Sequence, residues 1–319
     1  MKILVAGATG VIGRRLVPLL VHSGHDVAGL TRLRERAPGL EALGARAVVG
    51  DALDRDGLIA LVRAERPEVV IDELSDTPRE LGPGHTEEQF AGTNRLRMDG
   101  TRNLVDAARA AGARRVIAQS YAHIYAPQGG WVKHENDPLN LGSGVPEGRR
   151  HSVEAIVALE DAVLHTPGIE GLALRYGAFY GPGTTYAADG AFAQLVRIRH
   201  MPVVGGGRGV TSFIHVDDAA AVTALALRGP TGVYNVVDDY PAAAADWLPF
   251  YAELLGARPP AHVPALLVRT LGREHFAFRS TEQRGASNLR ARRDLGLVPV
   301  YASWRKGFAA ELREERMAA

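Results

Sequence analysis

The stretch KILVAGATGVIGRRLVPLL, residues 2–20, decides the fold of this chain. It begins with an apolar run that suits a buried strand, and it ends with apolar side chains at helical spacing. Gly7, Gly10 and Gly13 lie between the two parts. The first glycine permits a tight turn, the second lets backbone approach an anion, and the third allows close packing of helix on strand. The stretch therefore predicts a strand, a turn and a helix that bind the pyrophosphate of a dinucleotide.

The alternation of strand and helix continues through the first two thirds of the chain. Further strand-like runs read HDVAGLTR, RAVVGD, EVVIDEL, RRVIAQS and GLALRYG. Between the strands, helical patterns such as IGRRLVPLLVHSG and GTRNLVDAARAAGA have a glycine after the last turn. Such βαβ units predict an α/β fold with a doubly wound parallel (Rossmann) sheet.

The pattern changes near Phe179, where glycine-rich segments such as YGPGTTY and VVGGGRG begin. The helical pattern VDDAAAVTALAL and the strand GVYNVVDD then indicate a return to the sheet, and the remaining segment is mainly helical. We therefore expect a dinucleotide-binding domain over residues 1–178 and 210–238. We expect a smaller, mainly helical substrate-binding lobe over residues 179–209 and 239–319.

Composition narrows the class of protein. The chain has 319 residues, of which 46% are hydrophobic and 23% charged, as is ordinary for a soluble globular protein. A formal net charge of +1 gives no electrostatic reason for a nucleic-acid or membrane partner, so we expect a small-molecule substrate. The absence of cysteine excludes a thiolate nucleophile. The first apolar run is too short for a signal segment, and we expect a cytoplasmic protein.

The end of the second predicted strand bears on the choice of dinucleotide. A protein that binds NAD(H) usually places an acidic residue there, against the ribose hydroxyls. This chain has Thr31, Arg32 and Arg34 instead. Arginine is permanently charged and donates two parallel hydrogen bonds to a phosphate. We therefore predict that NADP(H) is preferred over NAD(H). Solvated charges at the start of a helix are the alternative explanation of the arginines.

Together these motifs resemble the extended short-chain dehydrogenase/reductase superfamily, in its NAD-dependent epimerase/dehydratase group. The resemblance also rests on GDALD at 50–54, GTRNLVDAA at 100–108, LRYGAFYGPGT at 174–184 and SFIHVDDAA at 212–220. It implies cofactor contacts at the matching positions. These are Gly7, Thr9, Gly10, Val11, Ile12 and Gly13 in the turn, Thr31, Arg32, Arg34, Asp51 and Ala52 near the adenosine, and Tyr176, Gly177 and Phe179 near the nicotinamide.

The same resemblance shows which residues this chain lacks. In the family, a tyrosine exchanges a proton with the substrate while hydride moves, and a lysine lowers the pKa of that tyrosine. Their positions are Ser152 and Ile156 here, and no lysine occurs between Lys133 and Lys306. A serine hydroxyl alone is a much poorer acid or base at neutral pH. The usual acid–base mechanism of the family is therefore not available to this chain.

A second departure lies in RRVIAQSYAHIYAP, residues 114–127. The family has a serine or threonine four residues before a tyrosine in this segment, and counting back from Tyr125 leads to Tyr121, with Ser120 beside it. One hypothesis is an exchange of roles, in which Tyr121 donates the proton and Ser152 or Ser120 assists. The alternative is that Tyr121 packs in the cleft wall with its hydroxyl bound to water.

Other titratable residues are weaker candidates for chemistry. His123 is two residues along the strand from Tyr121 and could act as an acid, although a structural histidine is the simpler interpretation. Lys133 lies in a loop that could cover the cleft or remain solvated. His215, Asp217 and Asp218 look like a metal cluster, but the family match makes them structural. We therefore expect no metal.

The substrate end of the sequence leaves several functions open. Family members that act on nucleotide sugars have an arginine where this chain has Thr211, although Arg208, Arg279 and Arg284 could compensate. We predict an NADP(H)-dependent oxidoreductase, a reductase of a small-molecule carbonyl with a non-standard proton donor. The alternatives are a nucleotide-sugar epimerase or dehydratase and a non-catalytic NADP(H) sensor. The apolar face of VEAIVALEDAVL suits either a homodimer contact or burial within one chain.

Overall fold

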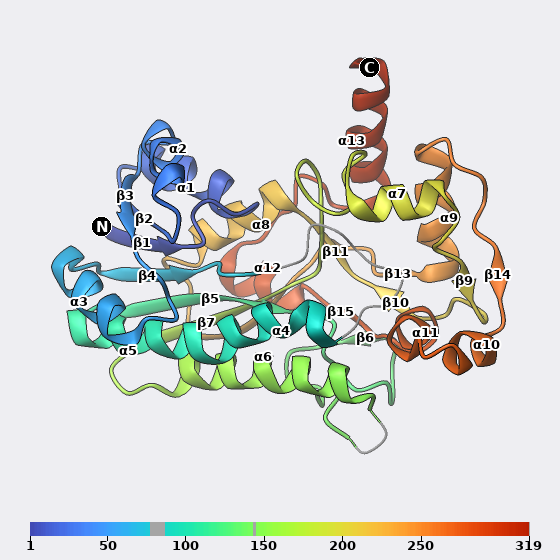
Figure 1. The fold of residues 1–319 in the computed structure, drawn as a ribbon, viewed down its shortest axis with the longest axis horizontal. Helices are drawn as coiled ribbons and strands as arrows, with labels where there is room; N and C mark the ends of the chain where they lie inside the picture. Colours follow the sequence, from blue (N-terminus) through green and yellow to red (C-terminus); the bar gives the residue numbers. More distant parts are fainter. Residues whose placement is uncertain (77–86, 143–144, 319) are drawn as a thin grey trace.

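A seven-stranded parallel sheet forms the centre of the protein (Figure 1). The computed structural model describes residues 1–76, 87–142 and 145–318. The strand order is β12-β7-β5-β4-β1-β2-β3. These strands are β1 (Lys2–Ala6), β2 (Asp26–Thr31), β3 (Arg46–Val49), β4 (Val69–Asp72), β5 (Arg115–Tyr121), β7 (Glu170–Tyr176) and β12 (Gly232–Val236). The prediction of a doubly wound parallel sheet is confirmed.

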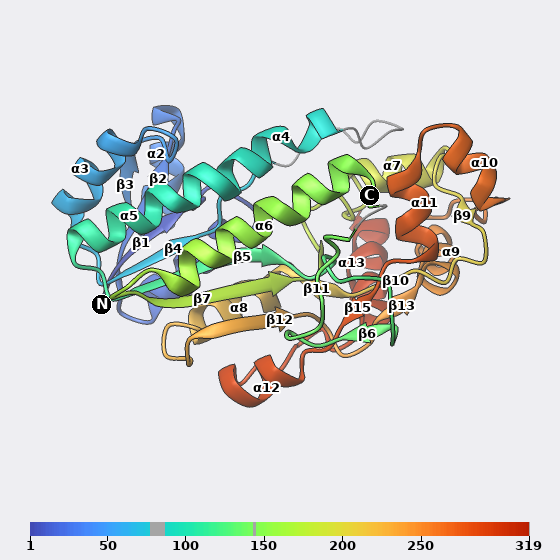
Figure 2. The same ribbon diagram turned by 90° about the horizontal axis from the view of Figure 1, so that it is seen from below.

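Helices cover both faces of the sheet (Figure 2). One face carries α1 (Gly13–His22) and α8 (Val216–Leu225), and the other carries α3 (Arg55–Glu65), α5 (Thr101–Ala111) and α6 (Glu147–His165). Successive side chains of a strand point to opposite faces. In β1, Ile3 and Val5 therefore pack with α1, whereas Leu4 and Ala6 pack toward α3 and α5. This two-sided burial explains why the strands are continuous apolar runs.

A second group of elements lies beyond the end of the sheet, where α7, α9, α10 and α11 gather in Figure 1. Its buried core is largely aromatic and includes Tyr186, Phe213, Trp247 and Phe308. The remaining helices are η1 (Arg34–Arg36), α2 (Ala37–Ala42), α4 (Glu87–Arg95), η2 (Leu96–Gly100), α7 (Ala191–Arg197), α9 (Ala244–Leu254), α10 (Ala265–Thr270), α11 (Glu274–Thr281), α12 (Leu289–Leu295) and α13 (Trp304–Ala318). The short strands are β6 (Val132–Lys133), β8 (Ala178–Tyr180), β9 (Val203–Val204), β10 (Val210–Thr211), β11 (Phe213–His215), β13 (Ala242–Ala243), β14 (His262–Val263) and β15 (Gly285–Ala286).

One C-terminal element packs on the sheet instead of on this aromatic core. Helix α12 contacts β12, and Ala291, Leu295 and Leu297 are buried in the same cluster as the strands. Residues 239–319, predicted as part of the lobe, thus also complete the core of the sheet. The division into a domain and a lobe stays a prediction. Of the range 1–178, residues 77–86 and 143–144 lie outside the described part of the chain.

The apolar face of α6 is used within the chain. Val153 and Ile156 pack with Ile124 and Tyr121, and Leu159 and Val163 join the core beneath α5. Among the helices that the structure describes, none has both the length and the apolar character needed to cross a membrane.

Candidate active site

A cleft with a volume of about 1360 Å³ opens at the carboxyl ends of the strands. Its lining combines residues that follow β1, β4, β5 and β7 with residues from α6, α7 and α11. In a doubly wound sheet, ligands bind at this edge, where the strand order reverses. Here the reversal falls between β1 and β4. The cleft is therefore one continuous space at the edge of the sheet where a dinucleotide is expected.

The glycine turn is shaped by close contacts of the backbone. Gly7 has a φ of 79°, and a Cβ added there would collide with the backbone of Glu73. The amide of Gly10 donates to the carbonyl of Gly7 at 2.8 Å. A Cβ on Gly13 would collide with Gly7 and Ala8, so this glycine lets α1 approach β1. Five of the predicted turn residues line the cleft, namely Gly7, Thr9, Gly10, Val11 and Ile12. Gly13 is absent from the lining and packs against Gly7 and Ala8. The turn fits a pyrophosphate at the N-terminus of α1.

The adenosine end of the cleft is lined by Thr31, Arg32, Asp51 and Ala52. The Asp51 carboxylate accepts a hydrogen bond from the amide of Leu53 at 2.9 Å, which fixes the loop after β3. All of these positions were predicted from the sequence.

Two more arginines, Arg14 and Arg36, complete this end. Arg36 lines the cleft and reaches Thr9 Oγ1 at 3.4 Å, whereas Arg34, two residues earlier, is absent from the described lining. Arg14 Nε donates to the carbonyl of Thr9 at 3.0 Å. Sequence reasoning selected Arg34 and missed Arg36 because the short helix η1 sets which of the two faces the turn.

The nicotinamide end contains a buried acid that sequence reasoning missed. Tyr176 Oη donates to Glu73 Oε1 at 3.0 Å and lies 2.5 Å from Thr223 Oγ1. Burial raises the pKa of Glu73 to about 8, so its carboxyl group is mainly protonated at neutral pH. Its Oε2 has no hydrogen-bond partner among the described residues. The two consecutive acids in EVVIDEL, Asp72 at the end of β4 and Glu73 just after it, were the available signal, since acidic side chains are rarely buried.

Gly177 and Phe179 line the cleft beside this acid. The rings of Tyr176 and Phe179 have centroids 5.2 Å apart. A Cβ on Gly177 would lie 2.7 Å from the carbonyl oxygen of Ser212, so the chain here passes close to its neighbour. The three residues predicted to contact the nicotinamide, Tyr176, Gly177 and Phe179, thus lie together on one wall of the cleft.

The predicted catalytic residues Tyr121, Ser120 and Ser152 all line the cleft, but they differ in what they contact. Ser120 is buried and donates to Glu160 Oε1 at 2.6 Å. Glu160 also forms a buried ion pair with Arg175, with a nitrogen–oxygen distance of 2.7 Å. The Ser120 hydroxyl therefore belongs to a buried network that joins α6 to the sheet.

Ser152 and Ile156 are one turn apart on α6 and both face the cleft. Ser152 Oγ donates to the carbonyl of Gly148 at 3.0 Å and accepts from Asn94 Nδ2 at 3.3 Å. Ile156 is buried among apolar side chains. The positions of the family's acid–base pair therefore open on the cleft but carry a bonded hydroxyl and an apolar side chain, and no lysine occurs in the described lining.

Tyr121 ends β5 and is half-buried. Its ring meets that of His123 edge to face, with centroids 5.0 Å apart. Within the described residues, its hydroxyl makes no hydrogen bond to protein. Whether Tyr121 donates a proton stays a prediction, but its hydroxyl is available to a ligand.

Three arginines surround Tyr121, namely Arg97 on η2, Arg149 on α6 and Arg279 on α11. Burial lowers the pKa of Arg97 and of Arg149 to about 10, which leaves both charged at neutral pH. Sequence reasoning considered Arg279 for phosphate recognition and missed Arg97 and Arg149. Nothing in their local sequence marks these two, because only the tertiary fold brings them to Tyr121.

His123 is buried and neutral. Burial, with Arg279 and Arg149 nearby, lowers its pKa to about 3. Its Nε2 accepts a hydrogen bond from the amide of Ser212 at 2.9 Å. The imidazole therefore cannot serve as an acid near neutral pH, and it ties the end of β5 to the segment before β11.

Lys133 and Thr211 lie away from the cleft lining in the described structure. Lys133 is buried in β6, which pairs with β15, and its Nζ donates to the carbonyl of Gln128 at 2.5 Å. Thr211 Oγ1 accepts from Gln283 Nε2 at 3.2 Å. The position of the family's phosphate-binding arginine is thus internal here.

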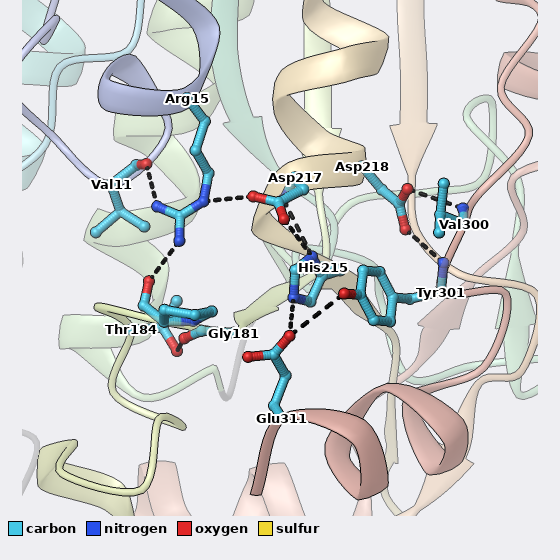
Figure 3. Close-up of polar contacts among 11 residues, drawn as sticks. Val11, Arg15, Gly181, Thr184, His215, Asp217, Asp218, Val300, Tyr301 and Glu311 are labelled. Carbon is cyan, nitrogen blue, oxygen red and sulfur yellow. Dashed lines mark hydrogen bonds and ion pairs between the residues drawn. The ribbon is translucent and has the colours of Figure 1, made fainter. Parts of the chain in front are cut away.

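His215, Asp217 and Asp218 each have a protein partner, as Figure 3 shows. His215 Nδ1 accepts from the amide of Asp217, and Nε2 lies 3.2 Å from Glu311 Oε1. Asp217 pairs with Arg15 at 2.6 Å.

The Asp218 carboxylate accepts from the amides of Val300 and Tyr301 at 2.8 and 3.0 Å. The Asp217–Arg15 pair thus joins α8 to α1, the Asp218 contacts join α8 to the segment before α13, and the His215–Glu311 contact joins β11 to α13. Among the described residues, no cluster of metal-ligating side chains is found.

The fold and the cleft together are those of a protein with a Rossmann-type site for a dinucleotide. Residues 3–236 match the model of the NAD dependent epimerase/dehydratase family, and the chain belongs to this family. It is 48% identical, over 98% of its length and 100% of the relative, to a Streptomyces protein named 3-diazoavenalumate denitrifying reductase. The chain is therefore an enzyme of the NAD(P)-dependent oxidoreductase and epimerase class, which answers the alternative of a non-catalytic sensor.

More distant relatives agree on the fold and the class. A Stigmatella aurantiaca protein named 4-hydroxy-2-methyl-3-oxo-4-farnesyl-3,4-dihydroquinoline-1-oxide ketoreductase is 27% identical over 85% of this chain and 82% of its own. The structure of a UDP-glucose 4-epimerase from Thermus thermophilus in complex with NAD covers 100% of both chains, with a TM-score of 0.73 and 24% identity.

Proposed function

We propose that this enzyme is an NADP(H)-dependent reductase that replaces the diazo group of an aromatic compound by hydrogen and releases dinitrogen. The relative that is 48% identical is named for a denitrifying reduction of a diazo compound. The observation that carries the proposal is the unequal preservation of the cleft. The predicted cofactor end is lined by residues at positions that resemble the family's motifs, whereas the positions that correspond to its proton-transfer pair hold Ser152 and Ile156.

This loss fits a reaction that needs hydride and no proton. The reduced nicotinamide supplies a hydride, and hydride that replaces the diazo group of an aryl diazonium ion gives the arene and dinitrogen, with atoms and charge in balance. The turn at Gly7 and Gly10 would bind the pyrophosphate, and Tyr176 and Glu73 would wall the nicotinamide side. Ile156, where the family has a charged amine, is apolar, which suits a reaction with no tyrosine whose pKa must be lowered.

The preference for NADP(H) is supported by the adenosine end of the cleft. Arg32 and Arg36 line it, and their positions suit the 2′-phosphate that distinguishes the two dinucleotides. We expect Arg36→Gln to weaken NADPH binding about ten-fold and to leave NADH binding unchanged, because it removes one charge-assisted contact. Titration of protein fluorescence with each dinucleotide measures this. Arg34→Gln is the matched control on the same short helix. Equal losses for NADPH and NADH in Arg36→Gln would contradict the preference.

A second candidate function is reduction of a carbonyl with Tyr121 as the proton donor. It is favoured by the Tyr121 hydroxyl, which makes no protein hydrogen bond in the described structure, and by a relative named as a ketoreductase. A carbonyl oxygen must gain a proton as hydride enters the carbon, so this reaction needs an acid in the cleft.

One experiment separates the two reactions. Purified enzyme with NADPH is given an aryl diazonium acid and, separately, a panel of aryl ketones, while absorbance of the reduced cofactor and release of dinitrogen are followed. We expect dinitrogen to form in equal amount to the NADPH consumed. Tyr121→Phe should leave this rate within a few-fold, whereas ketone reduction that depends on Tyr121 should fall about 100-fold. NADPH oxidation by ketones alone would replace the first function with the second.

A further inference from the structure

Arg97, Arg149 and Arg279 bring three positive charges to the end of the cleft around Tyr121. They come from η2, α6 and α11, which are remote from one another in the sequence. Tyr121 is close enough to interact electrostatically with each guanidinium group, and Arg279 is close enough to Arg149 for the two charges to repel. The three side chains therefore form one cluster.

Within the part of the chain that the structure describes, protein carboxylates leave this cluster unneutralised. Among the described residues, Glu282 is the acidic side chain that interacts with any of the three, namely with Arg149, and Glu282 is already paired with Arg269 at 2.5 Å. The guanidinium groups use neutral acceptors. Arg97 donates to Asn94 Oδ1 at 3.3 Å, Arg149 to the carbonyl of His123 at 3.0 Å, and Arg279 to Tyr186 Oη at 3.4 Å.

Arg149 shows this lack of a neutralising negative charge most directly. Its side chain is 7% exposed, its guanidinium carbon lies 3.9 Å from the centre of the Phe278 ring, and its Nε has no hydrogen-bond partner within the described structure. A buried charge that no opposite charge neutralises is costly. An anion in the cleft would offset that cost for all three arginines together. Guanidinium groups also match planar two-oxygen anions well, since they donate pairs of parallel hydrogen bonds.

We infer that Arg97, Arg149 and Arg279 form a site for the carboxylate of an aromatic acid, which orients the substrate across Tyr121 toward the nicotinamide. The inference rests on the proposed function for the aromatic part of that substrate. A diphosphate has the same anionic chemistry. The carboxylate is favoured because Thr211, at the position of the family's phosphate-binding arginine, is buried, is absent from the described cleft lining, and carries no positive charge.

The test measures binding, with cinnamate, uncharged cinnamamide and uridine diphosphate as probes. Each is titrated by calorimetry into the enzyme saturated with NADPH. We expect cinnamate to bind at least about ten-fold more tightly than cinnamamide, which is a difference of about 1.4 kcal/mol. Arg279→Met should abolish that preference and leave the affinities for cinnamamide and NADPH unchanged. Arg284→Met is the matched control, because Arg284 stacks on Trp131 and is outside the described cleft lining.

Arg97→Met provides a second variant if Arg279→Met does not fold, and it should give the same loss of preference. Equal binding of cinnamate and cinnamamide by the unaltered enzyme would overturn the site. So would an unchanged preference in both variants, or uridine diphosphate binding more tightly than cinnamate. Because no turnover is measured, failure of the enzyme to reduce diazo compounds would count against the proposed function and not against the anion site.

Discussion

The two ends of the cleft are built by different means. At the cofactor end, the contacts are made by backbone atoms. Gly7 lies so close to the Glu73 carbonyl that no Cβ fits between them, and Gly13 lets α1 approach β1. At the reacting end, contacts depend on side chains, with Tyr121 and three arginines supplied by separate elements. Backbone geometry tolerates almost no substitution, whereas a side chain can be exchanged on an unchanged scaffold. The comparison shows how one fold can keep its cofactor and acquire a different reaction.

The largest effect is expected at the backbone end, from Gly7→Ala. The new Cβ would collide with the Glu73 carbonyl, so we expect a protein that is unfolded or unable to bind NADPH. Thermal unfolding and NADPH titration measure the two outcomes. Gly24→Ala is the control, since Gly24 has the same φ of 79° but nothing within 4 Å of the added Cβ. Comparable losses in the two variants would show that φ, and not the contact with Glu73, governs the turn.

The next effect concerns α6, which keeps its place in the fold although it lacks the proton-transfer pair. Glu160→Ala leaves Arg175 buried without its partner, and we expect a loss of about 3–5 kcal/mol in the free energy of unfolding. Asp161→Ala, at the next position, breaks an exposed contact with His165 and should cost under about 1 kcal/mol. Urea denaturation measures both. Similar losses in the two variants would show that the buried Glu160–Arg175 ion pair is not what holds α6 against the sheet.

A smaller effect is expected from the buried acid between the two ends. The pKa of Glu73 is raised from 4.5 to about 8 in the folded protein, so the folded state binds this proton more tightly than the unfolded state does. The stability from this group is fully present below pH 4.5 and is lost as pH rises toward 8. The slope is at most about 1.4 kcal/mol per pH unit.

Glu73→Gln mimics the protonated acid and should remove this slope. We expect the difference in unfolding free energy between the variant and the unaltered enzyme to grow in favour of the variant across that interval. Urea denaturation at a series of pH values gives the difference. A difference that is constant with pH would mean that Glu73 is not protonated in the folded protein.

Local signals in the sequence predicted the sheet and the cofactor end. Glycines at 7, 10 and 13, after an apolar strand, impose their geometry on adjacent residues. Asp51 follows β3 and Tyr176 ends β7, and the carboxyl ends of these parallel strands lie at one edge of the sheet. Arg97 and Arg149 could not be predicted, because a guanidinium group on a helix looks the same whether it faces water or a cleft. Glu73 was missed although it follows Asp72 directly after a buried strand, because a pair of acids in the sequence does not show which of them is enclosed and protonated.

Helix α12 has a consequence for the order in which the chain folds during synthesis. Ala291, Leu295 and Leu297 fill the sheet core next to β12, although they follow that strand by more than fifty residues. While the chain is being synthesised, the apolar surface beside β12 stays exposed until α12 has left the ribosome. This surface is therefore buried late, and chaperones that recognise apolar surface would bind the nascent chain at β12.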